Sequence, residues 1–283
     1  MEFKFGDNKK SNLKIRFVGG KKSDLKIRFG PAGLGGVKEA AENLQEYNKL
    51  CLKACEIAFT YGVYIKNKKD AEEIGKEAKK QGIKLSIHAQ YWINLNSKEK
   101  KKIEESKKRI LDCCEIGSFL GAYCVVFHPG YYGGMDKIIT YNNIKREILE
   151  MQEEIKKNKW QIQLAPETTG KVNVFGSVDE IKKLTDETGC FFCLDFAHIL
   201  AREKKVDYKT ILEKFKDFKE LHVHFSGIEY GEKGEKRHVK TKKNEAKELI
   251  ENLKRYAKDK EIVIINESPY STEDSVMALK FIK

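Results

Sequence analysis

Six apolar runs in this chain each carry a histidine or an acidic residue at or near their C-terminal end. The runs are 85–87, 125–127, 160–166, 191–194, 221–225 and 262–266, and the polar residues are His88, His128, Glu167, Asp195, His224 and Glu267. Short apolar runs of this kind are typical of buried strands. A fold that buries all six runs must also accommodate the polar residue at the end of each run. It can either bring these six residues together or leave each one isolated.

Helical segments alternate with these strands along the chain. Counting 25–29 and 55–61 as two further strands gives eight strand–helix units, which predicts an α/β fold of the (β/α)8 TIM-barrel type. The helices are expected at about 37–50, 69–81, 97–120, 137–158, 177–188, 199–216 and 244–258, with a last helix from about residue 272. Active sites in this fold lie at the C-terminal ends of the strands, where the polar residues are expected to meet.

We expect a single catalytic domain, 25–283, preceded by an N-terminal extension, 1–24. The sequence LKIRF at 13–17 is repeated at 25–29, which indicates two paired strands or a small duplication. The glycine-rich segment 30–36 lacks the residue spacing of known phosphate-binding loops. It is therefore predicted to be a turn from strand to helix.

The composition limits the class of protein. The net charge of +12 fits a polyanionic partner or the Lys/Glu-rich surface of heat-adapted proteins. No signal peptide or membrane-spanning run is evident, so we expect a cytoplasmic protein with no membrane partner. Cys190 and Cys193 form a CxxC inside an apolar run without a second pair, which favours reduced, buried thiols over a zinc finger.

The candidate metal ligands are imidazoles and carboxylates. They are His88, His128, Glu167, Asp195, His198, His224, His238 and Glu267. These ligand types favour zinc, with manganese as the alternative. Eight ligands are too many for one tetrahedral ion and suit two or three ions bridged by a carboxylate, an arrangement that favours phosphoryl chemistry. Taken singly, each residue also fits a polar strand end, and Asp195 also fits a helix N-cap.

Several motifs, in order from about residue 25 to the end, resemble those of endonuclease IV-type apurinic/apyrimidinic endonucleases (AP endonuclease family 2). HAQYWINL at 88–95 is similar to their HxxYxINL, and DFAH at 195–198 matches their DxxH. FHPG at 127–130, ETTG at 167–170, VHF at 223–225, RH at 237–238 and ESP at 267–269 resemble the remaining motifs. The resemblance implies a zinc-dependent phosphodiesterase that nicks DNA 5′ to abasic sites and trims blocked 3′ ends.

The resemblance also implies roles for individual residues. It assigns one ion to His88, His128 and Glu167, a second to Glu167, Asp195, His224 and Glu267, and a third to His198 and His238. Because Glu167 bridges two ions, we expect it to be a catalytic residue together with Glu267. In the family, a zinc-held hydroxide attacks the phosphorus.

The sequence departs from the family pattern in two places that affect the site. The Asp ligand of the family's DRH motif is replaced by Lys236, and Glu235, one residue earlier, is the candidate substitute. His222 is an extra imidazole close to His224, so the choice between them as metal ligand stays open.

The expected partner is double-stranded DNA with abasic sites, bound by a monomer. The predicted DNA contacts are Tyr91, Trp92, Lys66, Lys236 and Arg237, and by resemblance Tyr91 enters the minor groove. Two other classes remain open. One is a sugar isomerase or epimerase of the xylose isomerase-like barrels, and the other is a nucleic-acid-binding barrel that has lost its chemistry together with the Asp ligand.

Overall fold

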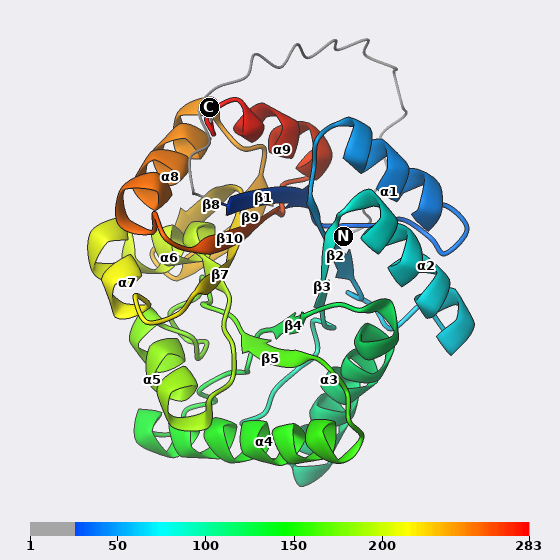
Figure 1. Cartoon of the computed structure of the whole chain (residues 1–283). Coiled ribbons are helices and arrows are strands. Elements are labelled where there is room, and N and C mark those ends of the chain that lie inside the picture. Colours follow the sequence, from blue (N-terminus) through cyan, green and yellow to red (C-terminus); the bar gives the residue numbers. More distant parts are fainter. Residues whose placement is uncertain (1–25, 283) are drawn as a thin grey trace.

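The computed structural model describes residues 26–282, in which eight parallel strands form a barrel inside a ring of helices (Figure 1). The strands are β1 Lys26–Pro31, β2 Ala54–Ala58, β3 Lys84–His88, β4 Cys124–Phe127, β5 Gln163–Pro166, β6 Leu194–Asp195, β7 Glu220–Phe225 and β10 Glu261–Asn266. They pair as two halves, β2-β3-β4-β5 and β1-β10-β7-β6. Bridges from Ala32 to Glu56 and from Glu167 to Cys193 join the halves, which confirms the predicted TIM barrel.

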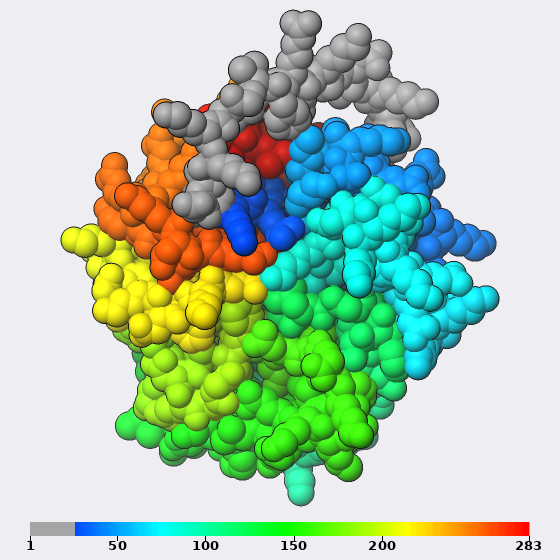
Figure 2. Space-filling model, in the orientation of Figure 1, coloured from blue at the N-terminus to red at the C-terminus, as the bar shows by residue number. Residues whose placement is uncertain are grey.

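Nine helices cover the barrel within the described residues. They are α1 Ala40–Lys49, α2 Lys68–Gln81, α3 Lys100–Leu120, α4 Lys137–Lys157, α5 Val178–Thr188, α6 Phe196–Glu203, α7 Tyr208–Lys214, α8 Lys243–Tyr256 and α9 Ser271–Leu279. Local sequence fixes several ends. For example, Ser177 and Glu180 form a capping box at the start of α5. In space-filling form, consecutive segments follow one another around the molecule (Figure 2).

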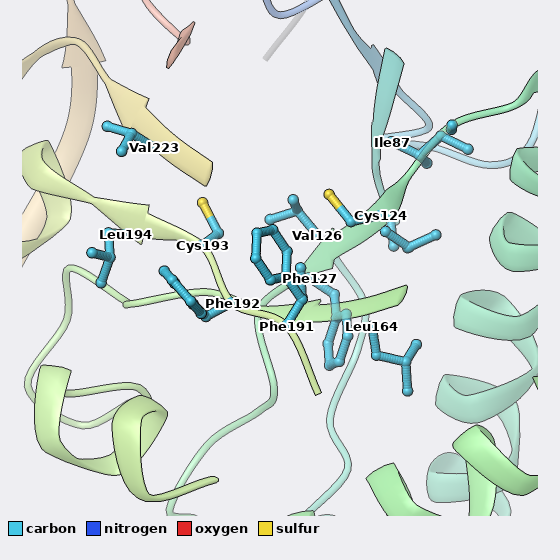
Figure 3. Packing of buried hydrophobic residues seen from close by; sticks show 14 of the residues in the cluster. Ile87, Cys124, Val126, Phe127, Leu164, Phe191, Phe192, Cys193, Leu194 and Val223 are labelled. Atoms are coloured by element: carbon cyan, nitrogen blue, oxygen red, sulfur yellow. The ribbon is translucent and has the colours of Figure 1, made fainter. Parts of the chain in front are cut away.

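The apolar core lies mainly between the strands and the helices. Leu164, Phe192 and Leu194 belong to this buried layer (Figure 3). Close backbone approach is part of the closure of the barrel, since a Cβ at Gly30 would lie 1.7 Å from the Ala54 carbonyl oxygen. Only a backbone without a side chain fits there.

The inside of the barrel is polar at its N-terminal end and in its middle. Arg28 Nε lies 3.0 Å from Glu261 Oε1, and Lys84 forms ion pairs with Glu220 and Glu261. Side chains alternate between the two faces of a strand. The neighbours of Glu56 on β2 face the helices, so Glu56 points into the barrel, in the middle of its length.

The structure corrects the predicted elements at two places. The single helix expected over 199–216 is two helices, α6 and α7, because Lys204 ends α6 in a left-handed conformation and Asp207 caps α7. The segment after β7 is a hairpin of β8 Gly227–Gly231 and β9 Gly234–Val239 rather than a loop. Of the repeat, the copy at 13–17 and the first residue of the copy at 25–29 lie outside the described residues.

Candidate metal centre

Glu167 follows β5 and lies at the centre of the converging side chains. Its Oε2 lies 3.3 Å from His88 Nε2 and 3.0 Å from His128 Nε2. Its Oε1 lies 3.0 Å from His224 Nδ1. One fully buried carboxylate thus faces imidazoles from β3, from the end of β4 and from β7. This is the geometry expected of a bridging ligand, with one oxygen available to each of two ions.

A second group forms around the other oxygen of Glu167. It contains Glu167, Asp195, His224 and Glu267, which offer ligand atoms within 4.8 Å of one another. Asp195 Oδ1 accepts a hydrogen bond of 2.7 Å from the backbone N–H of His198 and caps α6. Asp195 Oδ2 is buried and accepts no hydrogen bond from the described residues. The two oxygens therefore serve two purposes, because one caps the helix and the other is left for a cation.

His198 and His238 form a third group together with Asp195. His198 lies in the first turn of α6, although the sequence placed it in a turn before a helix. Its Nδ1 donates to the Thr168 carbonyl oxygen at 3.0 Å. His238 Nδ1 lies 2.6 Å from Ser226 Oγ, whose own proton goes to the Gly227 carbonyl, so this nitrogen is also a donor. The two remaining Nε2 atoms lie 3.2 Å apart.

Glu235 completes this third group in place of the missing aspartate. Its carboxylate lies 3.4 Å from His198 Nε2 and 3.9 Å from His238 Nε2. The cause is a β-bulge. Glu229 pairs with Arg237 and the next residue, Tyr230, pairs with Glu235, so Lys236 is the extra residue. The bulge shifts by one position which side chains of β9 point to each face of the hairpin. As a result, Glu235 faces His238 and Lys236 is exposed.

The absence of a side chain at Gly170 allows this approach. A Cβ there would lie 2.7 Å from Glu235 Cβ and 3.0 Å from His198 Cδ2. The Glu235 backbone N–H also donates to the Gly170 carbonyl oxygen at 3.0 Å. The loop after β5 and the β8–β9 hairpin are therefore packed directly against each other over the third group.

The electrostatics of the cluster favour bound cations. Burial alone would lower the pKa of His88, but the Glu167 carboxylate raises it to about 9. Burial alone would raise the pKa of Glu267, but His224 lowers it to about 2. Burial raises the pKa of Asp195. Converging carboxylate oxygens and imidazole nitrogens fit divalent ions, which would take the place of protons here and would be held by the three groups described above.

Comparison with known proteins places the chain. A family model described as a xylose isomerase-like TIM barrel matches residues 49–269. The chain belongs to this family. A sequence relative, an uncharacterized protein of Methanocaldococcus jannaschii, is 37% identical in an alignment of 267 positions that covers 88% of this chain and 95% of the relative.

Solved structures with a similar fold include an endonuclease and an epimerase. SacUVDE superimposes with a TM-score of 0.69 at 15% identity, over 90% of this chain and 97% of that chain. Endonuclease IV from Thermus thermophilus superimposes with a TM-score of 0.67 at 20% identity, over 90% of this chain and 97% of that chain. A D-psicose 3-epimerase solved in the presence of D-fructose superimposes with a TM-score of 0.65 at 15% identity, over 91% of this chain and 97% of that chain. At these identities the likeness establishes the fold.

The surface of this family member near the metal centre carries exposed aromatic side chains. Tyr91 and Trp92 follow β3, and their ring centroids lie 6.4 and 6.1 Å from that of Tyr61, which follows β2. Tyr91 is 51% exposed, Trp92 60% and Tyr61 61%. The Tyr91 ring is also 6.4 Å from that of His88. The aromatic patch of Tyr61, Tyr91 and Trp92 therefore borders the metal centre.

The predicted basic contacts are exposed, and one is already paired. Lys66 and Lys236 are exposed, and Arg237 forms a double hydrogen bond to Glu229 at 2.9 Å for each pair of atoms. All seven cysteines lie within the described residues, and all are free thiols there. None of the helices among residues 26–282 has the length and hydropathy that a membrane span requires.

Sequence reasoning missed Glu56. This residue is fully buried inside the barrel, and its Oε1 lies 3.0 Å from His224 Nε2. A signal was present, because a charged residue in the middle of an otherwise apolar strand is unusual unless it is paired. The predicted set considered only residues at the ends of strands and in the segments that follow them.

Proposed function

We propose that this protein is a metal-dependent phosphodiesterase that cuts double-stranded DNA 5′ to abasic sites and trims blocked 3′ ends. The observation that carries the proposal is the third ligand group, Asp195, His198 and His238 with Glu235 beside it, next to the two groups that share Glu167. Adjacent divalent ions suit in-line displacement at phosphorus, because they bind both the attacking and the departing oxygen.

The residues of the chain have distinct tasks in such a reaction. When bound, zinc or manganese ions supply a hydroxide near neutral pH and offset charge on the phosphoryl oxygens. Glu167 holds the spacing between two ion positions, since each of its oxygens faces a different imidazole group. Glu267 lies 3.4 Å from His224 Nδ1 and adds negative charge beside the same position. Thr168 and Ser226 fix the ring orientation of the two histidines in the third group.

The aromatic patch is where we propose that DNA meets the site. Exposed rings beside a metal centre can stack on bases or fill the gap left by a missing base. The exposed Lys66 and Lys236 are available to phosphates, and Arg237 can exchange Glu229 for a phosphate oxygen. We propose that the protein acts as a cytoplasmic monomer.

A sugar epimerase is the second candidate. The group of Glu167, Asp195, His224 and Glu267 has the carboxylate and imidazole composition that a single catalytic ion in such enzymes uses. That reaction leaves His128, His198 and His238 without a task. The additional imidazoles therefore favour the phosphodiesterase.

The direct test is incubation with a duplex that carries one abasic-site analogue. Cleavage 5′ to the analogue, lost with chelator and restored by zinc or manganese, supports the proposal. Interconversion of D-fructose and D-psicose without DNA cleavage supports the epimerase. Metal-independent binding of the duplex without cleavage supports the binding protein that has lost its chemistry.

A further inference from the structure

A further cluster of potential ligands lies inside the barrel, beneath the metal centre. It consists of Glu56 on β2, His222 and His224 on β7, and Cys193 just before β6, and all four side chains are fully buried. Figure 3 shows the sulfur atom of Cys193 pointing toward the space between β7 and β3. Carboxylate, imidazole and thiolate together are a ligand set typical of zinc-class ions.

The distances within this interior cluster suit one ion. His222 Nε2 lies 3.1 Å from His224 Nε2, and the Glu56 oxygens lie 3.2 and 3.0 Å from these two nitrogens. Cys193 Sγ and the imidazole nitrogens lie within 4.8 Å of one another. Ligand atoms around a tetrahedral zinc ion are about 3.3–3.8 Å apart, given bond lengths of about 2.0–2.3 Å. Small shifts therefore bring Cys193, His222 and His224 into coordination, and Glu56 lies beside the two imidazoles.

Hydrogen bonds leave one atom of this cluster without a partner. The two Nε2 atoms face each other, so at most one of them can carry a proton without a repulsive contact. Glu56 Oε1 is buried and accepts no hydrogen bond from the described residues, although it lies 3.0 Å from His224 Nε2. Unpartnered buried carboxylate oxygens are rare and costly. A cation between these atoms supplies the partner that Glu56 Oε1 lacks.

The cluster also has the supporting hydrogen bonds that metal ligands usually have. Ser86 Oγ donates to Glu56 Oε2 at 2.8 Å. The Tyr123 hydroxyl hydrogen-bonds to His222 Nδ1, which leaves His222 Nε2 directed into the cluster. Partners of this kind orient ligands and set the tautomer of a ligating histidine. Glu56 and His222, which the metal centre does not use, are therefore both held in a ligating orientation.

We propose that Glu56, Cys193, His222 and His224 bind an additional divalent transition metal ion inside the barrel. His224 would then be an imidazolate, with Nδ1 in the metal centre beside Glu167 and Nε2 on the interior ion. Binding displaces the proton of its ring and the proton of the Cys193 thiol, and both go to solvent. The interior ion joins β2, β6 and β7 and fixes the orientation of a metal-centre ligand. This inference does not depend on the substrate of the enzyme.

The test uses the sulfur ligand, because the metal centre itself has only nitrogen and oxygen ligands. The full-length protein is loaded with cobalt(II), and its near-ultraviolet spectrum is recorded. We expect a thiolate-to-cobalt charge-transfer band that disappears in Cys193→Ser and persists in Cys124→Ser, a matched control at another buried cysteine of the barrel. Glu56→Gln should bind one ion fewer per chain than the wild type by elemental analysis.

Wild-type protein alone also decides the question if a variant fails to fold. X-ray absorption at the zinc edge should show a sulfur neighbour at about 2.3 Å. A fully loaded wild-type protein with neither the charge-transfer band nor the sulfur neighbour overturns the proposal. Failure to cleave abasic DNA changes neither readout, so the two proposals can fail separately.

Discussion

His198 Nε2 lies 3.2 Å from His238 Nε2, and neither nitrogen carries a proton when its ring is neutral. The opposite nitrogen of each ring donates to a fixed oxygen, which places two lone pairs face to face. Such a contact is repulsive unless a cation lies between the rings. The pair is thus explained by a bound ion or a shared proton, and Glu235 beside it supplies the negative charge that a metal ion needs.

Removal of the Glu235 charge should empty this third position. We expect Glu235→Gln and Glu235→Ala to behave like His238→Ala, with metal affinity at this position reduced by at least about 100-fold, the upper range found when supporting residues are changed. Elemental analysis should show one ion fewer, and cleavage should fall as far as in His128→Ala.

The matched control is Lys236→Gln, next in sequence but exposed on the bulge. It should keep the metal content of the wild type and lose only DNA affinity. Full activity in Glu235→Ala together with a severe loss in His238→Ala would show that a different residue supplies the anionic ligand.

A methyl group at Gly170 should disturb the same position without a change of charge. The new Cβ meets Glu235 Cβ at 2.7 Å and His198 Cδ2 at 3.0 Å, so Gly170→Ala must push the hairpin or the imidazole away. We expect a reduction of about 10-fold in affinity for the third ion and an intact fold by circular dichroism. Gly36→Ala is the control, because its Cβ has no neighbour closer than 3.6 Å. Equal metal affinity in both variants would contradict the packing argument.

The bridging carboxylate can be tested by an isosteric change. Glu167→Gln keeps the size of the side chain and removes the charge shared by two cations, and it should lower cleavage by about 1000-fold or more, in line with the several kcal/mol that metal clamps contribute. DNA affinity, measured with uncleaved duplex, should change little because phosphates are held by Lys and Arg side chains. Normal turnover would remove Glu167 from the mechanism.

The aromatic patch gives a prediction about substrate recognition. Tyr91→Ala should weaken binding of the abasic duplex by about 10-fold, since stacking contributes about 1–3 kcal/mol per base. Metal content should stay at the wild-type level. Leu149→Ala, at an exposed apolar position on the outer helix α4, is the control. Equal affinities for abasic duplex in Tyr91→Ala and wild type would show that DNA does not contact the patch.

Much of the fold was predictable because strand ends and helix periods are local features. The barrel follows from alternation of short apolar runs with helices, and the predicted ligands meet because parallel strands end on the same face. The hairpin of β8 and β9 was not predictable from apolar periodicity, since its strands are exposed and charged. Helix α6 starts directly at the end of β6, without a loop between them. His198 therefore lies in the helix that Asp195 caps.

The remaining differences between the predicted and the observed site depend on contacts between residues that are distant in sequence. The bulge that turns Glu235 inward is set by pairing across the hairpin, and the aligned sequence shows only Lys236 in the expected place. Glu56 gains its partners from β3 and β7, which are far away in sequence. The choice between His222 and His224 was open in the sequence because both face inward. In the structure only His224 contacts Glu167 directly.

The central claim is tested most directly by following a duplex with a single abasic-site analogue under metal-replete and chelated conditions. The account predicts a nick 5′ to the analogue, with a 3′-hydroxyl on the upstream fragment, that chelator abolishes and added zinc or manganese restores. An intact duplex under metal-replete conditions, with the metal content confirmed by elemental analysis, would contradict it.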